Sequence, residues 1–358
     1  MNKLLLYPKY SGSFYDKYLF NLINEINKDW EIHVISFAKN HLLKGSNKLI
    51  YHIHDKLEYW SKNNDYKELE YVFNYSIEKK ISRVHLIRTN YESFFSMISN
   101  YPDIKMLNIS FGIFGHREIY ESRSRFNLIR NIMNKNCISN AIVHSISNDL
   151  KPPNTNYCSS KLLASSDPIY DNIKDYESIK EKSDSEKIRY TFFGMAYYGK
   201  GLDIYSDALD FLDQKTALNT LHTFAGNLKL SPKNEFLNKK ALILDRYFDE
   251  IEVLNLFKNT DVLVLPYRKT YENVTSGVLV QAALSETLVI APDIYPFNKV
   301  INEYKLGLLF KAEDSQSLSE AINFMTENIL YLKKIANFKI FVNKIESWDS
   351  ICRKLKFK

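Results

Sequence analysis

The chain has 358 residues and a mass of 42.0 kDa, a length typical of two domains. Hydrophobic residues make up 45% and charged residues 25% of the sequence, which excludes a disordered or fibrous protein. The net charge is +6, and the segment from Lys333 to Lys358 alone has eight basic and two acidic residues, so the rest of the chain is close to neutral. Because proteins that bind nucleic acid usually have a strong overall positive charge, we expect no nucleic-acid partner.

The three cysteines are odd in number and lack the spacing of a metal site, which favours a reducing compartment. No apolar run approaches the ~20 residues that a membrane span needs. The apolar stretch Leu4–Leu6 near the N-terminus is too short for a signal peptide. We therefore expect a cytoplasmic protein.

Short apolar runs alternate with longer segments of helical periodicity along the whole chain, beginning with a predicted helix over Phe14–Lys28. In the first half, strands are predicted at Lys3–Tyr7, Glu31–Phe37, Arg83–Thr89, Lys105–Phe111, Ala141–Ile146 and Lys161–Ala164. In the second half, strands are predicted at Arg189–Phe193, Leu221–Ala225, Ala241–Leu244, Val262–Pro266, Leu288–Ala291 and Gly307–Phe310. Continuously apolar strands are typical of parallel sheets that are buried on both faces. Two successive sets of βαβ units predict an α/β protein with two doubly wound domains.

The domain boundaries follow from composition. We expect an N-terminal domain over residues 1–165, a polar and charged linker over 166–187 and a C-terminal domain over 188–335. A basic helix is expected over 336–358, which we predict to return to the N-terminal domain. Its pattern fits either a solvated surface helix or a helix that touches an anionic membrane surface, where each basic residue contributes about 1 kcal/mol.

Residues 191–209, TFFGMAYYGKGLDIYSDAL, place a glycine-rich loop between a strand and a helix. Three of the ten glycines, Gly194, Gly199 and Gly201, fall within eight residues around Lys200. Glycines allow tight turns and close approach of the backbone to an anion, and the lysine adds positive charge where the strand ends. The pattern fits a phosphate-binding loop, and it also fits an ordinary turn with a surface lysine.

A second loop, in residues 261–293, leads into a helix. A buried strand ends at Pro266, and a polar segment then runs to Thr275, Ser276 and Gly277, which we expect at the start of a helix that continues to Leu284. Free amides and the helix dipole at such a position favour a phosphate. Alternatively, Ser276 is an ordinary helix N-cap.

Residues 188–310 resemble the retaining nucleotide-sugar glycosyltransferases of the GT-B fold, the large group 1 or family 4 type. The usual signature of that family is Gly-Arg-x4-Lys-Gly, then a strand that ends in proline, then Glu-x7-Glu. Gly194, Lys200 and Gly201 match the first part, and LPY, SGVLVQA, VIAPD and KLGLLF follow in the family's order. The resemblance implies two Rossmann-like domains that face each other across a cleft. It also implies a nucleoside-diphosphate sugar as donor substrate, with no further cofactor.

The resemblance assigns the donor site to the C-terminal domain. Gly194, Lys200, Thr275, Ser276 and Gly277 are implied to hold the diphosphate, where Lys200 stabilises the charge of the departing group. Arg246 lies near the segment that holds the base in the family. Lys200 is the first of three implied catalytic residues.

Three positions depart from the signature. The family's arginine is replaced by Met195, and Asn273 and Gln281 stand where the two glutamates are usual. The resemblance assigns Asn273, the second implied catalytic residue, to the transferred sugar and Gln281 to the donor ribose. Amides still hydrogen-bond hydroxyl groups, although they supply no negative charge. Glu272, one residue away, is a candidate substitute for the first glutamate.

On the acceptor side, the family often has a histidine after a central strand of the N-terminal domain. His116 is the candidate here and the third implied catalytic residue, and the alternative is a surface histidine. Ser11, Gly12 and Ser13, in the loop after the first strand, are small enough for a substrate to approach. The implied acceptor is a saccharide or a polyprenyl-linked saccharide.

The resemblance implies retaining sugar transfer in the biosynthesis of a bacterial surface polysaccharide such as O-antigen, capsule or lipopolysaccharide. We expect an enzyme of the hexosyltransferase type. It is expected to be metal-independent, in keeping with the absence of an Asp-x-Asp triplet from the sequence. We also expect peripheral contact with the anionic inner face of the cytoplasmic membrane. Two alternatives stay open. The departures at Met195, Asn273 and Gln281 favour a non-catalytic sugar-nucleotide-binding subunit, and a GT-B nucleotide-sugar epimerase is the weaker alternative.

Overall fold

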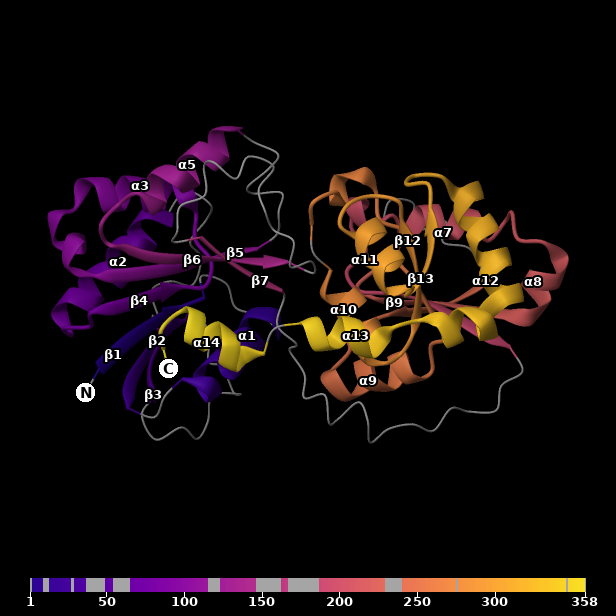
Figure 1. The fold of residues 1–358 in the computed structure, drawn as a ribbon, viewed down its shortest axis with the longest axis horizontal. Helices are drawn as coiled ribbons and strands as arrows, with labels where there is room; N and C mark the ends of the chain where they lie inside the picture. The colour runs from indigo at the N-terminus through magenta and orange to yellow at the C-terminus, as the bar shows by residue number, and fades with distance from the viewer. Residues whose placement is uncertain are drawn as a thin grey trace. The chain divides into compact units, whose positions relative to one another are not determined.

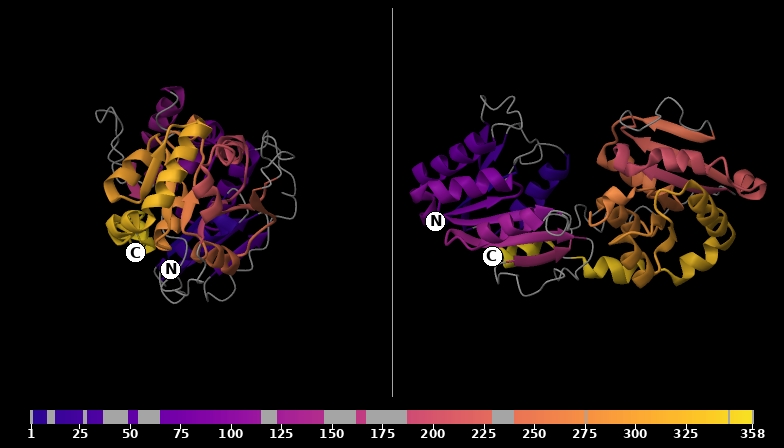
Figure 2. Two further views of the ribbon diagram at one scale, coloured as in Figure 1. Left: turned by 90° about the vertical axis from the view of Figure 1, so that its right-hand side faces the viewer. Right: turned by 90° about the horizontal axis from the view of Figure 1, so that it is seen from above.

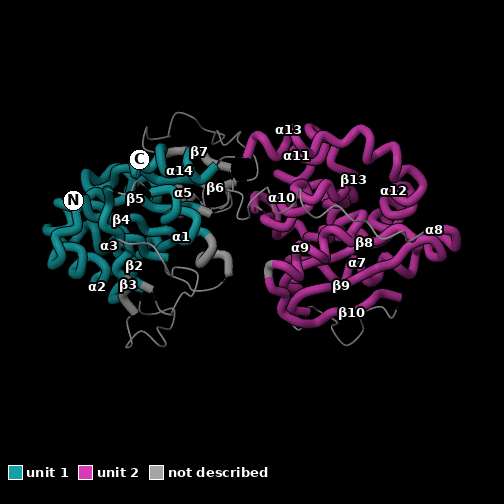
Figure 3. The backbone as a smooth tube through the Cα atoms, turned by 90° about the horizontal axis from the view of Figure 1, so that it is seen from below, with its two compact units in different colours: residues 1–170, 346–358 teal, residues 171–345 magenta. Residues whose placement is uncertain are grey.

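The computed structural model describes residues 2–8, 13–26, 29–36, 49–53, 65–114, 123–145, 162–166, 187–228, 240–274, 276–345 and 347–357. The chain divides into two compact units (Figure 3). Unit 1 comprises Met1–Tyr170 and Glu346–Lys358, and unit 2 comprises Asp171–Ile345. No helix among these residues is both long and apolar enough to cross a membrane.

Unit 1 contains a seven-stranded parallel sheet in the order β3-β2-β1-β4-β5-β6-β7 (Figure 1). Its strands are β1 (Asn2–Tyr7), β2 (Trp30–Ser36), β3 (Leu49–Ile53), β4 (Arg83–Leu86), β5 (Asn108–Phe114), β6 (Ile138–Ser145) and β7 (Leu162–Ser166). Its helices are α1 (Ser13–Glu25), α2 (Asp65–Glu78), α3 (Tyr91–Asn100), the 3-10 helix η3 (Pro102–Met106), α5 (Arg123–Met133) and α14 (Trp348–Lys354).

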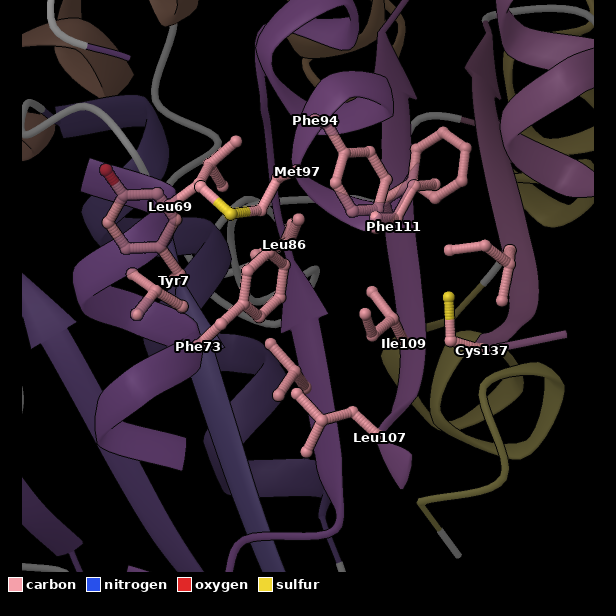
Figure 4. Packing of buried hydrophobic residues seen from close by; sticks show 14 of the residues in the cluster. Tyr7, Leu69, Phe73, Leu86, Phe94, Met97, Leu107, Ile109, Phe111 and Cys137 are labelled. Atoms are coloured by element: carbon pink, nitrogen blue, oxygen red, sulfur yellow. The ribbon is translucent and has the colours of Figure 1, made fainter. Parts of the chain in front are cut away.

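Side chains that alternate along β1 enter two different cores. Leu5 and Tyr7 belong to a buried cluster with residues of α2, α3 and α5, whereas Leu4 and Leu6 belong to a cluster with residues of α1 and α14. Successive side chains of a strand point to opposite faces, so helices cover both faces of the sheet. Figure 4 shows the first cluster, in which the rings of Phe94 and Phe111 meet edge to face at 5.5 Å.

The strand around residue 110 differs from its predicted range. Lys105–Phe111 was expected, but β5 begins at Asn108, because Pro102 starts the 3-10 helix η3 and leaves Met106 74% exposed. Proline fixes a φ that suits the first turn of a helix. The apolar residues Ile104 and Met106 therefore belong to a turn and not to the strand.

The expected single helix over 336–358 is wrong. The structure has two short helices, α13 (Phe338–Lys344) in unit 2 and α14 in unit 1. Ser347 accepts a hydrogen bond from the Ser350 amide and starts α14 as an N-cap. Within unit 1, Trp348 packs against Tyr18 of α1 at 4.8 Å between ring centroids.

Unit 2 contains a six-stranded parallel sheet in the order β10-β9-β8-β11-β12-β13. Its strands are β8 (Ile188–Phe193), β9 (Thr220–Gly226), β10 (Ala241–Asp245), β11 (Val262–Val264), β12 (Leu288–Pro292) and β13 (Gly307–Phe310). Its remaining helical elements are η5 (Tyr198–Lys200), α7 (Leu202–Ala208), α8 (Gln214–Asn219), α9 (Glu250–Lys258), η7 (Lys269–Tyr271), α10 (Gly277–Leu284), α11 (Phe297–Tyr304) and α12 (Ser315–Ile335).

Helices also cover both faces of the second sheet (Figure 2). Tyr190 of β8 hydrogen-bonds through its hydroxyl to Thr326 of α12, whereas Phe193, on the opposite side of the same strand, packs against Phe257 of α9. The continuous apolar strands β11 and β12 are fully buried, as a sheet covered on both faces requires. The prediction of two doubly wound α/β units is confirmed.

The strand orders place one topological switch point in each sheet. In unit 2 the chain runs from β8 outward to β9 and β10, and then returns to β11 on the other side of β8. The loops after β8 and β11 therefore leave neighbouring strands in opposite directions, and ligands of doubly wound sheets bind there. In unit 1 the switch point lies between β1 and β4.

Candidate functional site

The loop after β8 carries Lys200 at the switch point of unit 2. Gly194 follows the strand with a φ of +124°, residues Tyr198–Lys200 form one 3-10 turn, and Gly201 is the N-cap of α7 with a φ of +62°. A left-handed backbone costs little at glycine and more at any residue with a side chain. The glycines that suggested a phosphate loop therefore shape a turn that fixes the position of Lys200.

Lys200 lies against aromatic rings. Its Nζ donates a hydrogen bond to the hydroxyl of Tyr267 at 2.6 Å and lies 3.9 Å from the centroid of that ring and 4.7 Å from that of Tyr271. Among the described residues it has no carboxylate partner. Burial lowers the pKa of the Lys200 amine to about 7, because desolvation disfavours the charged form. An anion bound beside Lys200 would restore the charged state.

The loop after β11 connects Lys200 to the start of α10. Tyr267 is fully buried, and its hydroxyl also hydrogen-bonds Ser276 Oγ at 3.1 Å. Burial raises the pKa of the Tyr267 hydroxyl well above its usual value, so the phenol stays protonated. Ser276 occupies the N-cap position of α10 but makes no side-chain cap bond. Ser276 therefore has the backbone position of an N-cap, whereas its hydroxyl hydrogen-bonds Tyr267 and makes no cap bond.

The first amides of α10 are available to an anion. Gly277 and Val278 donate to no acceptor among the described residues, as is normal for the first turn of a helix. Such amides and the helix dipole favour negative charge. Gln281 lies one turn further along α10 and is partly exposed, while Thr275 lies outside the described residues.

Asn273 has an unusual backbone at the entrance to α10. Its φ is +63°, and its amide donates to the carbonyl oxygen of Tyr295 at 2.8 Å. Its side chain is partly exposed, and the neighbouring Glu272 is exposed. The backbone amide of Asn273 therefore anchors the turn, and its side-chain amide is accessible to a ligand.

A buried ion pair ties the two loops together. Arg268 Nη2 lies 2.5 Å from Asp203 Oδ2 on α7, and each side chain is 10% exposed. The backbone amide of Arg268 also donates to the carbonyl of Gly199 at 3.0 Å, and its guanidinium lies over the ring of Tyr198 at 4.2 Å. The charge of Arg268 is thus neutralised by Asp203, whereas that of Lys200 is not neutralised by any described carboxylate.

Comparison with known proteins shows which proteins this arrangement resembles. Residues 174–339 match the family model "Glycosyl transferases group 1", which spans nearly all of unit 2. No curated protein matches the chain in sequence. A glycosyltransferase structure from Rickettsia africae ESF-5 has a TM-score of 0.71 at 14% identity, over 99% of this chain and 97% of that chain. The chain has the GT-B fold.

Two further structures share the GT-B fold at full length. Anabaena Alr3699/HepE in complex with UDP-glucose gives a TM-score of 0.68 at 14% identity, over 99% of this chain and 98% of that chain. WaaG, a glycosyltransferase involved in lipopolysaccharide biosynthesis, gives a TM-score of 0.65 at 13% identity, over 99% and 98% of the two chains.

The other residues predicted for the site of this GT-B protein lie on other elements or outside the described residues. Arg246, after the edge strand β10, pairs with Glu252 of α9 at 2.7 Å and lies over the ring of Phe248, so its charge is compensated at the surface. Ser11, Gly12 and His116 lie outside the described residues, and Ser13 is the first residue of α1. No three His, Cys, Asp or Glu side chains gather as a metal site in the described part of the chain.

Sequence reasoning missed the aromatic residues of the site. Tyr267 and Tyr271 surround the lysine, and the Tyr271 hydroxyl hydrogen-bonds that of Tyr197. The signal was present in the segments AYYGKG and PYRKTY, each of which places tyrosines beside basic residues. Tyrosine at a strand end is typical of core packing, so the segments alone did not indicate a role at the site.

Proposed function

We propose that the protein is a glycosyltransferase that takes a sugar from a nucleoside-diphosphate sugar and transfers it to a saccharide or polyprenyl-linked acceptor. The observation that carries this proposal is Lys200, a lysine without a carboxylate partner among the described residues, joined through Tyr267 to the N-terminus of α10. The match of residues 174–339 to glycosyl transferases group 1 supports it.

The chemistry is electrostatic. The bond between the anomeric carbon and the diphosphate oxygen breaks, the acceptor hydroxyl oxygen bonds to that carbon, and the acceptor proton passes to the departing diphosphate. The Lys200 ammonium and the amides of Gly277 and Val278 stabilise the negative charge that develops on the leaving group. These groups supply the positive charge without a metal ion, and the proposed outcome is retention of configuration.

The remaining donor contacts follow from position. Asn273, exposed at its turn, is assigned to the transferred sugar, and Gln281 on α10 to the ribose hydroxyls. Glu272 and Thr275, the sequence neighbours of Asn273 and Ser276, are assigned to the same donor site. Arg246 is assigned to the base side, where the exposed Tyr247 follows it. On the acceptor side, His116 with Ser11, Gly12 and Ser13 stays a prediction.

A role in a bacterial surface polysaccharide is the finer part of the proposal. It is supported by the structural likeness to WaaG, a glycosyltransferase involved in lipopolysaccharide biosynthesis, and the donor class is supported by the likeness to Anabaena HepE in complex with UDP-glucose. Peripheral contact with an anionic membrane surface is proposed for the basic C-terminal segment, in which Arg353 and Lys354 end α14.

One observation favours a second function. Met195, which stands in the place of the family's arginine, is 51% exposed beside the Lys200 loop, and Asn273 and Gln281 carry no charge. A subunit that binds nucleotide sugars without transferring them would retain Lys200 and lose these groups. An epimerase would turn over its donor without an acceptor.

A thermal-shift panel of UDP-, GDP- and other nucleotide sugars tests the proposal. A ligand at 100 times its Kd stabilises the protein by about 2.7 kcal/mol, and Lys200→Ala should abolish this shift. The matched control is Lys269→Ala, an exposed lysine of the same loop, which should shift like the wild type. A wild type that no nucleotide sugar stabilises, or a Lys200→Ala variant that is stabilised equally, would contradict the proposal.

The transfer assay then separates the alternatives. Transfer of labelled sugar to an acceptor extract supports the glycosyltransferase. Binding without transfer, followed by gain of transfer in Gln281→Glu, indicates a decayed site. Conversion of the donor sugar without any acceptor indicates an epimerase.

A further inference from the structure

The hydroxyl of Tyr267 lies between two groups of the candidate donor site. Lys200 Nζ is 2.6 Å from it on one side, and Ser276 Oγ is 3.1 Å from it on the other. Lys200 follows β8, whereas Tyr267 and Ser276 lie between β11 and α10. One buried hydroxyl therefore joins both loops of the switch point.

The donor determines the direction of the hydrogen bond between Lys200 and Tyr267. An ammonium has no acceptor, so the oxygen of Tyr267 accepts from Lys200. Tyr267 remains a phenol because it is buried, and its own proton is then free to be donated to Ser276 Oγ. Ser276 makes no side-chain cap bond in this arrangement, so the first amides of α10 are not covered by its hydroxyl.

Aromatic packing holds Tyr267 in place. Its ring lies 4.4 Å from that of Tyr271 and meets Phe297 edge to face at 5.5 Å. Lys200 Nζ lies over the rings of both tyrosines. A flexible lysine loses conformational freedom when it binds a ligand, and fixing it beforehand reduces that loss.

We propose that Tyr267 is a positioning residue for Lys200, whose hydroxyl holds the ammonium toward the N-terminus of α10 before a diphosphate binds. The inference rests on the proposed function, because it takes Lys200 as the group that binds the donor diphosphate. Tyr267 itself touches no reacting atom in this account. It acts through the position and the charge of Lys200.

The groups around Lys200 give the proposal a pH signature. Burial raises the pKa of Tyr267 and of Tyr271, so both stay neutral. Arg268 and Asp203, which join the two loops, neutralise each other. Lys200 titrates near pH 7 in the free protein, and a diphosphate binds its charged form. Affinity for a diphosphate should therefore fall as the pH rises above 7.

The test measures the affinity of UDP by calorimetry between pH 5.5 and 9. The terminal phosphate of UDP ionises at about pH 6, and this ionisation is common to all variants, so a difference in midpoint between variants reports the protein. Tyr267→Phe keeps the ring and removes the hydroxyl. It should weaken UDP binding about tenfold, in keeping with the loss of one charge-assisted hydrogen bond. It should also move the midpoint of the pH dependence downward, because the ammonium loses an acceptor.

The matched control is Tyr190→Phe, which removes another buried hydroxyl from unit 2, the one bonded to Thr326. It should leave both the affinity and the midpoint unchanged. A merely structural role of Tyr267 would change stability without moving the midpoint. If Tyr267→Phe does not fold, Ser276→Ala takes its place, since it removes the hydroxyl that hydrogen-bonds Tyr267 and should weaken UDP binding about threefold.

The outcomes separate this inference from the function on which it rests. Failure of the wild type to bind UDP or any other nucleoside diphosphate, or equal binding by Lys200→Ala, overturns the proposed function. Loss of binding in Lys200→Ala, together with wild-type affinity and midpoint in Tyr267→Phe, overturns the positioning role and leaves the function intact. For Ser276→Ala, wild-type affinity overturns the positioning role in the same way.

Discussion

The backbone of Gly201 lies directly against the carbonyl oxygen of Pro266. A Cβ placed on Gly201 would fall 2.0 Å from that oxygen, and the φ of Gly201 is +62°. The loop after β8 therefore touches the end of β11 with no room for a side chain between them. Since Lys200 immediately precedes Gly201, this contact determines where the lysine lies.

We predict that Gly201→Ala destabilises unit 2 by at least about 2 kcal/mol, because a left-handed backbone alone costs an alanine roughly 1–2 kcal/mol and the clash adds to it. Urea denaturation measures the loss. Gly277→Ala is the matched control, since no atom lies within 4 Å of its added Cβ, and its stability should change by less than about 0.5 kcal/mol. Equal stability of the two variants would show that the contact with Pro266 is not maintained in solution.

The ion pair between Asp203 and Arg268 should be costly to break. Asp203→Asn leaves the buried guanidinium without its carboxylate, and such a loss typically costs 3–5 kcal/mol, so we expect about that decrease in stability. The control is Glu327→Gln, which breaks the exposed pair with Lys215 and should cost less than about 1 kcal/mol.

The double variant Asp203→Leu with Arg268→Met tests the same pair from the other side. Asp203 Oδ1 and Arg268 Nε have no hydrogen-bond partner among the described atoms, so the native pair is incompletely satisfied. Apolar replacement of both residues should therefore recover most of the lost stability. A double variant that is less stable than Asp203→Asn would contradict this explanation.

The sequence predicted the two sheets because their strands are buried on both faces. The strands predicted at Val262–Pro266 and Leu288–Ala291 needed no tertiary information, and they coincide with β11 and β12 to within two residues. The basic charge of the C-terminal segment obscured the break between α13 and α14. The N-cap at Ser347 is a local signal, but its significance depends on packing of Trp348 against α1.

The candidate site was predictable in part. Glycine spacing and strand ends indicated Lys200 and Ser276, because backbone geometry is local. The link between them was not predictable, because Tyr267 lies 67 residues from Lys200 in sequence and only the pairing of β8 with β11 brings the two loops together. The resemblance placed Arg246 near the base-binding segment, and its pairing with Glu252 depends on how α9 begins.

His85 should make unit 1 sensitive to acid. It is fully buried on β4, its Nδ1 is 2.9 Å from Ser110 Oγ, and its Nε2 has no partner among the described atoms. Burial lowers the pKa of His85 to about 3, below the ~6.5 of an unfolded chain. The folded state thus favours the neutral ring. The free energy of unfolding therefore has its full value above about pH 6.5 and decreases toward pH 3, by up to about 1.4 kcal/mol per pH unit.

Tryptophan fluorescence during urea unfolding at pH 7.5, 6 and 5 measures this slope. All three tryptophans, Trp30, Trp60 and Trp348, lie in unit 1, so the signal reports that unit. His85→Asn retains a polar group near Ser110 and cannot titrate, so its slope should be smaller than that of the wild type. His222→Asn in unit 2 is the control, because the pKa of His222 is also lowered, to about 4, but in the other unit. Equal slopes in wild type and His85→Asn would contradict the assignment.

Asn273 allows its backbone and its amide to be tested separately. Its φ of +63° is tolerated by asparagine and glycine and is unfavourable for alanine. Asn273→Gly should leave the free energy of unfolding within about 0.5 kcal/mol of the wild type, whereas Asn273→Ala should lower it by roughly 1 kcal/mol. If the side-chain amide contacts the transferred sugar, both variants lose transfer to the same extent. Both variants should then bind UDP normally and bind a UDP-sugar no more tightly than UDP. Transfer at the wild-type rate in Asn273→Gly would show that this position matters for its backbone alone.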